Sequence, residues 1–329
     1  MKIIVVGGGI VGLSTALALL EHGFLDVKIV ADSFDDTTSH VAGAVWRPVF
    51  AGSTSDYTMD RWGHETMLWL RGLIEHYGTD VVGCKRTPGM ELQDTPIESH
   101  PYWAHSVEDF RLLTPEEALK HAPYTKKYGC VFTSIMIHPG VLMDWITKQI
   151  QARGGTFERR HVSSLNDLDA DIIVNCTGVN AGKLVNDANV YPVRGQVIKV
   201  INPAITRFIT VESHGQYTYI LPRHNGEVTL GGTAQPHNWS TENDQDDVKQ
   251  IMERCIALMP EVKDSKVLFA KAGLRPTTTT GTRVELDAKR TATGAWIVHN
   301  YGHGGSGHTI HRGCASDVVQ IIRSLHAKL

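Results

Sequence analysis

The sequence predicts an α/β fold in two parts, one built on a parallel sheet and the other on a mainly antiparallel sheet. Residues 1–31 show a short strand pattern, a glycine-rich turn, a helical pattern and a second strand pattern. Residues 194–233 are rich in strand-like segments. The chain of 329 residues is also longer than one small core needs.

The first part begins with a βαβ unit. Residues 2–6 are apolar, β-branched and followed at once by glycines, which is typical of a buried parallel strand. Residues 10–22 carry helical apolar spacing, and Gly23 is a suitable residue to end that helix. Residues 26–31 are again strand-like. A Rossmann-like domain is therefore expected.

The glycine-rich turn GGGIVG, residues 7–12, satisfies GxGxxG between a strand and a helix. Gly7 permits the tight turn, Gly9 lets the backbone approach a pyrophosphate, and Gly12 lets the helix and strand pack closely. The amides of the first helical turn and the helix dipole then hold phosphate. Asp32 lies about 20 residues after Gly12, where an acid hydrogen-bonds a ribose hydroxyl. The pattern predicts a bound dinucleotide but does not by itself separate FAD from NAD.

Further elements are predicted along the rest of the chain. Helices are expected over residues 59–77, 141–152, 243–259 and 309–325. Another helix is expected to begin at residues 114–117, which contain a capping box and a proline at the first helical position. Strands are expected over 170–175, 196–200, 217–221, 227–230, 266–270 and 295–299. Strands near 1–31, 156–178 and 295–300 are assigned to the parallel sheet, and those near 194–233 and 266–286 to the antiparallel one. The nucleotide-binding domain is then discontinuous, comprising residues 1–50, 140–185 and 286–329, and the second domain comprises 51–139 and 186–285.

Composition excludes several classes of function. The formal net charge of −3, without a Lys/Arg cluster, gives no case for nucleic-acid binding. The apolar stretches are too short to span a bilayer, and we expect no secretory signal. The five cysteines are odd in number and form no CxxC pair, which predicts reduced thiols in an intracellular compartment and no metal site.

Six later segments carry a more specific pattern. They are NCTG at 175–178, RGQVIKV at 194–200, YTYILP at 217–222, VTLGGT at 228–233, GLRP at 273–276 and HNYGHGGSG at 299–307. In this order and spacing the chain resembles the D-amino-acid oxidase and D-aspartate oxidase family, and D-amino-acid oxidase more closely. The resemblance runs from Lys2 to the last helix.

The resemblance implies a Rossmann-like FAD-binding domain, a noncovalently bound FAD, and a D-amino acid against the flavin face. Arg275 matches the arginine that pairs with the substrate carboxylate, Tyr219 matches the tyrosine that meets the same carboxylate, and Gly305 matches the glycine whose carbonyl accepts from the substrate amine. Tyr217 lies on the same strand face as Tyr219, and core packing and a site role are equally expected for it. Together with the glycine-turn and ribose positions, the FAD contacts expected are Gly7, Gly9, Ile10, Val11, Gly12, Asp32, Ser33, Thr38, Ser39, Gly43, Val45, Val162, Thr177, Gly178, Gly304, Gly305, Ser306, Gly307, His308 and Thr309.

These residue types suit an oxidative deamination. A carboxylate needs a planar bidentate donor, which arginine provides. Backbone amides and a helix N-terminus at 304–307 would stabilise reduced flavin. The implied reaction transfers hydride from the substrate Cα to FAD, and the imino acid then hydrolyses to a 2-oxo acid and ammonia, while O2 becomes hydrogen peroxide. An acid/base role for His303 or His308 is disfavoured, because hydride transfer needs no protein base.

The sequence departs from the family at two places. D-aspartate oxidases carry an arginine shortly after the Thr-Leu-Gly-Gly segment, whereas Ala234 stands here, which favours neutral D-amino acids. Arg47 could replace that charge, and Glu212 could attract a basic side chain, so both alternatives stay open. The family's mobile-lid tyrosine has no counterpart, Gly215 being nearest by spacing.

The expected partners are a D-amino acid and O2, with homo-oligomer formation left open. Ala327-Lys328-Leu329 is a conservative variant of the Ser-Lys-Leu peroxisomal address, which predicts an import receptor and a peroxisomal location, with the cytoplasm as the alternative. Alternative functions are a D-aspartate oxidase, a glycine or sarcosine oxidase, which the segments at 273–276 and 303–307 disfavour, and a non-catalytic FAD-binding sensor. An NAD-dependent dehydrogenase would be colourless.

Overall fold

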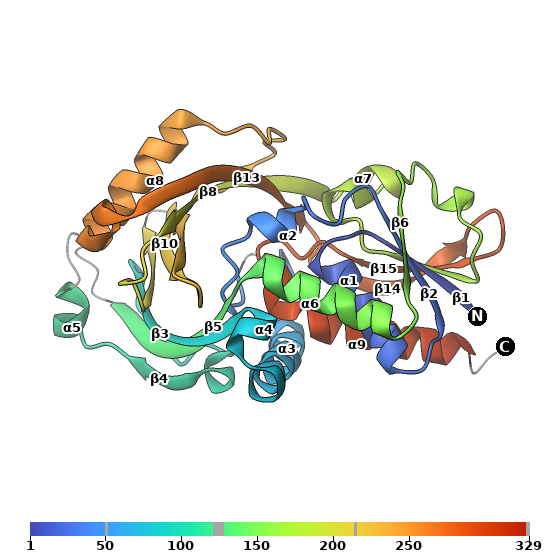
Figure 1. The fold of residues 1–329 in the computed structure, drawn as a ribbon, viewed down its shortest axis with the longest axis horizontal. Coiled ribbons are helices and arrows are strands. Elements are labelled where there is room, and N and C mark those ends of the chain that lie inside the picture. The colour runs from blue at the N-terminus through green and yellow to red at the C-terminus, as the bar shows by residue number, and fades with distance from the viewer. Residues whose placement is uncertain (50–51, 121–127, 214–215, 327–329) are drawn as a thin grey trace.

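A computed structural model describes residues 1–49, 52–120, 128–213 and 216–326, which form two sheets side by side (Figure 1). The helices are α1 (Ile10–Glu21), α2 (Thr38–Val41), α3 (Asp56–Tyr77), α4 (Thr79–Val82), α5 (Pro115–Leu119), α6 (Pro139–Ala152), α7 (Ala181–Leu184), α8 (Gln245–Leu258) and α9 (Gly307–His326). The strands are β1 (Lys2–Val6), β2 (Asp26–Ala31), β3 (Cys84–Gln93), β4 (Glu108–Leu112), β5 (Tyr128–Ile137), β6 (Thr156–Arg159), β7 (Ile172–Asn175), β8 (Val190–Ile201), β9 (Phe208–Ser213), β10 (Gln216–Pro222), β11 (Glu227–Gly231), β12 (Gln235–Pro236), β13 (Lys266–Thr278), β14 (Arg283–Arg290) and β15 (Trp296–Tyr301).

The first sheet has the order β14-β15-β7-β1-β2-β6. Its strands pair in parallel except β14, which is antiparallel to β15. Parallel strands are buried on both faces, which explains why β1 is apolar at successive positions. Ile3 and Val5 join the core that contains α1, α6 and α9, whereas Ile4 and Val6 pack with Leu165 on the other face.

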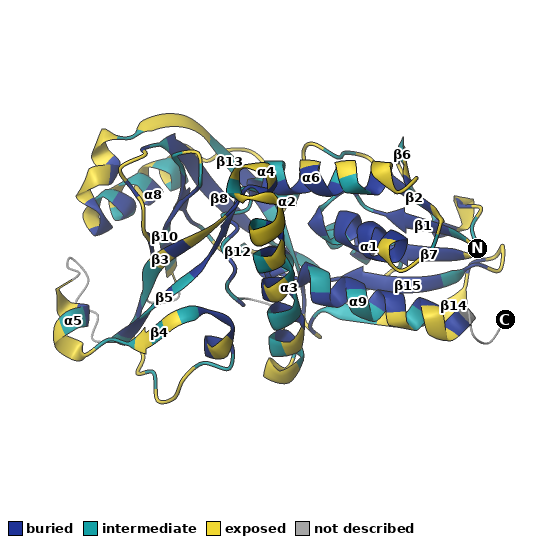
Figure 2. Ribbon diagram, turned by 60° about the horizontal axis from the view of Figure 1, so that its bottom comes forward, coloured by how far each residue is buried: buried dark blue, intermediate teal, exposed yellow. Residues whose placement is uncertain are grey.

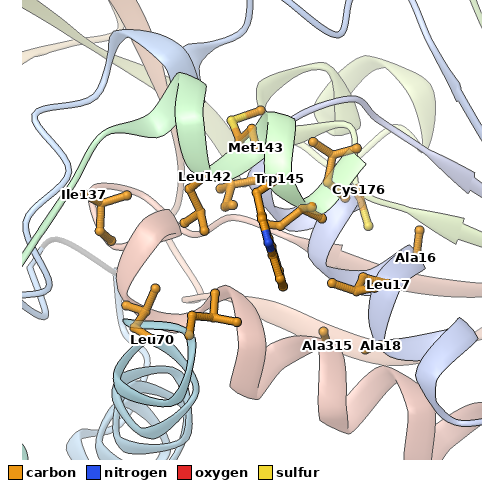
Figure 3. Close-up of a cluster of buried hydrophobic side chains, with 14 of the residues drawn as sticks. Ala16, Leu17, Ala18, Leu70, Ile137, Leu142, Met143, Trp145, Cys176 and Ala315 are labelled. Carbon is orange, nitrogen blue, oxygen red and sulfur yellow. The ribbon is translucent and has the colours of Figure 1, made fainter. Parts of the chain in front are cut away.

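The core on the helical side of this sheet is built by small and large side chains together. Figure 3 shows side chains of α1, α6, α9 and α3 gathered between these helices. Ala16, Leu17 and Ala18 of α1 are fully buried there, as are Leu142 of α6 and Ala315 of α9. Small alanines let the backbones of α1 and the neighbouring helices approach closely, so the second half of α1 is tightly packed in this core.

The second sheet has the order β12-β8-β11-β10-β9-β3-β5-β4, with β13 paired to β8. Its pairs are antiparallel except β3 with β9, which confirms the mainly antiparallel prediction. One face of α8 packs on this sheet through Ile251, Cys255 and Leu258, and its other face is exposed (Figure 2).

The structure has strands β3, β4 and β5 that were not predicted, and it places one predicted segment in the other sheet. No strand was expected at β3, which contains Pro88 and Gly89, because proline and glycine usually mark turns or sheet edges. Residues 283–286, assigned to the antiparallel sheet, belong to β14 and pair with β15 in the first sheet. The division of the chain into two domains at the residue ranges given above stays a prediction.

The thiols give a test of the core. All five cysteines are free and buried, and burial raises the pKa of Cys130, Cys176 and Cys255 to about 12 in each case. Because only the thiolate reacts, we predict that native protein resists iodoacetamide at about pH 8, whereas denatured protein is alkylated at all five positions. Mass spectrometry before and after denaturation measures this, and rapid native labelling of any cysteine would contradict the described packing.

Candidate active site

A cavity of about 670 Å³ begins at the glycine turn between β1 and α1 and extends to the second sheet. The chain brings widely separated segments to it, including α2, the loop after β7, the strands β10 and β13, and the turn before α9. Figure 1 shows α2 between the two sheets, beside the start of α1. The site therefore lies where the two parts of the molecule meet.

The glycine turn has the close approaches that the motif predicts. Gly7 has φ 127°, and a Cβ on it would lie 2.3 Å from the Cys176 carbonyl oxygen. A Cβ on Gly12 would lie 2.0 Å from the Gly7 carbonyl oxygen, so the helix packs directly on the turn. A Cβ on Gly9 would meet only side-chain atoms, at 3.0 Å or more. Gly7 and Gly12 thus shape the turn, and Gly9 leaves its cavity side open for a phosphate.

The predicted ribose position also faces this cavity. Asp32 follows β2, lines the cavity, and accepts a hydrogen bond from His161 Nδ1 at 2.9 Å. The amide of Ile10 donates to Ser39 Oγ at 3.0 Å, which ties the start of α1 to α2. These residues place a carboxylate and helix-terminal amides along one wall, an arrangement that fits the phosphates and a ribose of FAD.

Most residues predicted to contact the cofactor line the cavity. They are Gly7, Gly9, Ile10, Val11, Asp32, Ser33, Thr38, Ser39, Gly43, Val45, Val162, Thr177, Gly178, Gly304, Gly305, Gly307 and His308. Three others do not line it: Gly12 packs on Gly7, Ser306 Oγ accepts from the Val49 amide at 2.8 Å, and Thr309 Oγ1 donates to the Arg47 carbonyl at 3.0 Å. Ser306 and Thr309 therefore fix the loop at 47–49 against the start of α9.

Two histidines beside the start of α9, His303 and His308, are uncharged at neutral pH. Burial lowers the pKa of His303 to about 3 and that of His308 to about 4. His308 Nε2 lies 3.0 Å from the Ser39 carbonyl oxygen, so Nε2 carries the proton and donates it there. Neither ring supplies positive charge to the cavity, so the electropositive groups at the start of α9 are the helix N-terminus and the amides at 304–307.

The far end of the cavity holds Arg275 and Tyr219. Arg275 Nη1 donates to the Thr233 carbonyl at 2.9 Å, and no carboxylate lies within ion-pair distance of its guanidinium in the described part of the chain. The guanidinium lies flat against Gly195, where a Cβ would stand 2.3 Å from Nη1. Burial raises the pKa of Tyr219, and the Arg275 cation beside it opposes that rise. An uncompensated cation and a protonated phenol thus face the same space.

Tyr217 shares the cavity-lining face with Tyr219, as the alternation along β10 predicts. Its hydroxyl donates to Glu212 Oε2 at 2.7 Å. Burial is the main cause that raises the pKa of the Tyr217 hydroxyl, and its hydrogen bond to the Glu212 carboxylate raises it further. Glu212 itself is exposed and is not part of the cavity wall, and Gly215 lies outside the described residues.

An ion pair that the sequence did not predict also lines the cavity. Arg47 Nε donates to Glu91 Oε2 at 2.8 Å, and both side chains are largely buried. Thr210 lines the cavity nearby, and its Oγ1 is buried without a hydrogen-bond partner in the described residues. Glu91 and Thr210 were missed because β3 was not predicted as a strand and β9 carried no motif. A single acid within Met90-Glu91-Leu92 was the only signal.

The fold and cavity define an oxidoreductase of the dinucleotide-binding type. Residues 2–321 match the family described as FAD dependent oxidoreductase, and the chain belongs to this family. The D-amino-acid oxidase of Rubrobacter xylanophilus is 38% identical, over 97% of this chain and 95% of that protein. The D-aspartate oxidase of Homo sapiens is 34% identical, over 98% and 94%. Glycine oxidase from Geobacillus kaustophilus has the same fold, with a TM-score of 0.79, 20% identity, and coverage of 98% of this chain and 94% of that one.

Proposed function

We propose that this protein oxidises D-amino acids with bound FAD, giving 2-oxo acid, ammonia and hydrogen peroxide. One observation carries the proposal: the Arg275 guanidinium lacks a carboxylate partner in the described residues and faces the cavity beside Tyr219. A half-buried cation without a counter-ion is costly, so the site favours an anionic ligand there. The α-carboxylate of an amino acid is such a ligand. The D-amino-acid oxidases among the relatives support the same substrate class.

The chain's own residues would hold and orient this substrate. Arg275 donates two parallel hydrogen bonds to the carboxylate, and the Tyr219 hydroxyl donates a third. The Gly305 carbonyl accepts from the substrate amine, so three points fix which face of Cα is presented to the cofactor. Residues along the wall from Gly7 to Gly307 would hold FAD, which would supply the hydride acceptor, with O2 as the final electron acceptor. The imino acid product then hydrolyses in water.

Neutral side chains are favoured over acidic ones. Arg47, which could have neutralised a substrate's side-chain carboxylate, is already paired with Glu91, and Ala234 lines the cavity after the Gly-Gly-Thr segment. An acidic side chain would therefore be buried without a free cation. A D-aspartate oxidase, the activity named for the human relative, is the alternative.

Anaerobic mixing of the purified holoenzyme with D- and L-amino acids tests the function. We expect D-alanine and D-glutamine to bleach the flavin absorbance, and their L-enantiomers to leave it unchanged. Faster bleaching by D-aspartate than by D-alanine would favour the alternative. Yellow protein that no D-amino acid bleaches would reject oxidation and favour a non-catalytic FAD sensor.

Location and assembly also stay proposals. The prediction of a peroxisomal location and an import receptor depends on Ala327-Lys328-Leu329. These three residues lie outside the described part of the chain. Peroxide formation supports that location, and the bacterial relatives support the cytoplasm as the alternative. Homo-oligomer formation is left as an expectation. In the described ranges, no helix is both long and apolar enough to cross a bilayer.

A further inference from the structure

The Arg47–Glu91 pair occupies a defined place relative to the proposed carboxylate anchor. In the second sheet Tyr219 of β10 pairs with Thr210 of β9, and Thr210 pairs with Glu91 of β3. Residues paired across adjacent strands project from the same face, and all three of these line the cavity. Two strand spacings separate Tyr219 from Glu91, a distance of about 10 Å. The side chains that extend from Tyr219 and from the Arg47–Glu91 pair can together span this distance.

Several contacts hold Arg47 at this position. Its guanidinium contacts both Glu91 carboxylate oxygens, donates to the Pro48 carbonyl, and stacks over Trp103 at 4.4 Å from the ring centroid. Arg47 and Glu91 also line a second cavity of about 350 Å³, so the pair stands between the two cavities. The contacts with Pro48 and Trp103 do not depend on Glu91. They would keep the guanidinium in place if the Glu91 charge were removed.

The cavity wall between Tyr219 and Glu91 contains a polar atom that has no hydrogen-bond partner in the described part of the chain. Thr210 Oγ1, midway between Tyr219 and Glu91, is buried without a hydrogen-bond partner in the described residues. A buried hydroxyl without a partner is unfavourable, and a polar atom of a ligand side chain would satisfy it. The charged residues Asp32, Arg160 and Lys183 line the cavity on the side of the glycine turn. The part of the wall formed by Thr210 and the Arg47–Glu91 pair is polar but carries no net charge, because the two charges of the pair cancel.

We propose that Arg47, Glu91 and Thr210 form the subsite for the substrate side chain, and that the internal neutralisation of Arg47 by Glu91 makes the enzyme select uncharged polar side chains. This inference rests on the proposed function. An acidic substrate side chain is repelled by Glu91, and Arg47 is already paired with Glu91. A basic side chain is repelled by Arg47, and Glu91 is already paired with Arg47. An amide side chain can accept from Arg47, donate to Glu91 and reach Thr210 without disturbing the pair.

The isosteric substrates D-glutamine and D-glutamate test the proposal in the holoenzyme. Wild-type protein should have a kcat/KM for D-glutamine at least about tenfold above that for D-glutamate, the factor typical of one charge-assisted hydrogen bond. In Glu91→Gln the guanidinium loses its counter-ion, so this ratio should fall at least about tenfold through a gain with D-glutamate. The double variant R47Q/E91Q should restore the preference for D-glutamine. Glu75→Gln, which breaks an exposed pair with Arg86, is the matched control and should change nothing.

The outcomes separate this inference from the function on which it rests. If wild-type protein oxidises neither D-alanine nor D-glutamine, the proposed function fails. If it oxidises both and the ratio is the same in wild type and Glu91→Gln, the subsite is wrong. If R47Q/E91Q behaves as Glu91→Gln does, Arg47 is not the cause. Should Glu91→Gln not fold, equal wild-type activity on D-glutamine and D-glutamate would still overturn the inference.

Discussion

Replacing Arg275 with alanine should lower kcat/KM for D-alanine by about 30-fold to several thousandfold, because loss of the charge-assisted bidentate pair costs about 2–5 kcal/mol. The substitution removes the guanidinium that faces the cavity and leaves Thr233 with one unpaired carbonyl. FAD should stay bound, since the glycine turn and α9 lie elsewhere along the wall. Steady-state peroxide production and the flavin absorbance of the purified variant measure the two effects separately.

Two further variants sharpen this result. Arg275→Lys keeps the charge but cannot form the planar bidentate pair, so its activity should stay well below wild type. Arg290→Ala removes an exposed arginine of β14 that stacks over Trp296, and it should turn over substrate as wild type does. Unchanged turnover in Arg275→Ala would reject the carboxylate anchor, and loss of flavin in that variant would show that Arg275 acts on the cofactor site instead.

The Gly12→Ala variant should purify without flavin and therefore without activity. A Cβ at this position would lie 2.0 Å from the Gly7 carbonyl oxygen, and that neighbour is backbone, which cannot rotate away as a side chain can. The start of α1 must then separate from the turn, which moves the amides that hold the pyrophosphate. Overpacking of this kind also costs about 1–3 kcal/mol of stability. The ratio of flavin to protein absorbance and the thermal unfolding midpoint measure both.

A second glycine supplies the matched control. Gly72 lies on an exposed turn of α3, and no atom outside the local helix backbone lies within 4 Å of a Cβ built there. Gly72→Ala should keep full flavin content, and its free energy of unfolding should rise by about 0.5–1 kcal/mol, because alanine favours the helix more than glycine does. A Gly12→Ala protein that is as yellow and as stable as Gly72→Ala would mean that close packing at the turn does not position the cofactor.

The sequence by itself determined the features whose cause is local. The strand at Lys2–Val6, the turn at Gly7 and the helix from Ile10 follow from β-branched residues, missing side chains and apolar spacing over a few neighbouring residues. The alternation that places Tyr217 and Tyr219 on one face is local too, and both line the cavity. Arg275 stood out only through the order of several motifs, because an isolated arginine before a proline carries no such signal.

Only the tertiary structure decided which residues form the wall beside Tyr219. Glu91 reaches it because β3 lies next to β9 in parallel, although Pro88 and Gly89 read locally as a turn. Arg47 is neutralised by a residue far away in the sequence, a pairing that no spacing rule encodes. Strand neighbours are chosen by the burial of whole sheet faces, so register between distant strands depends on the complete fold.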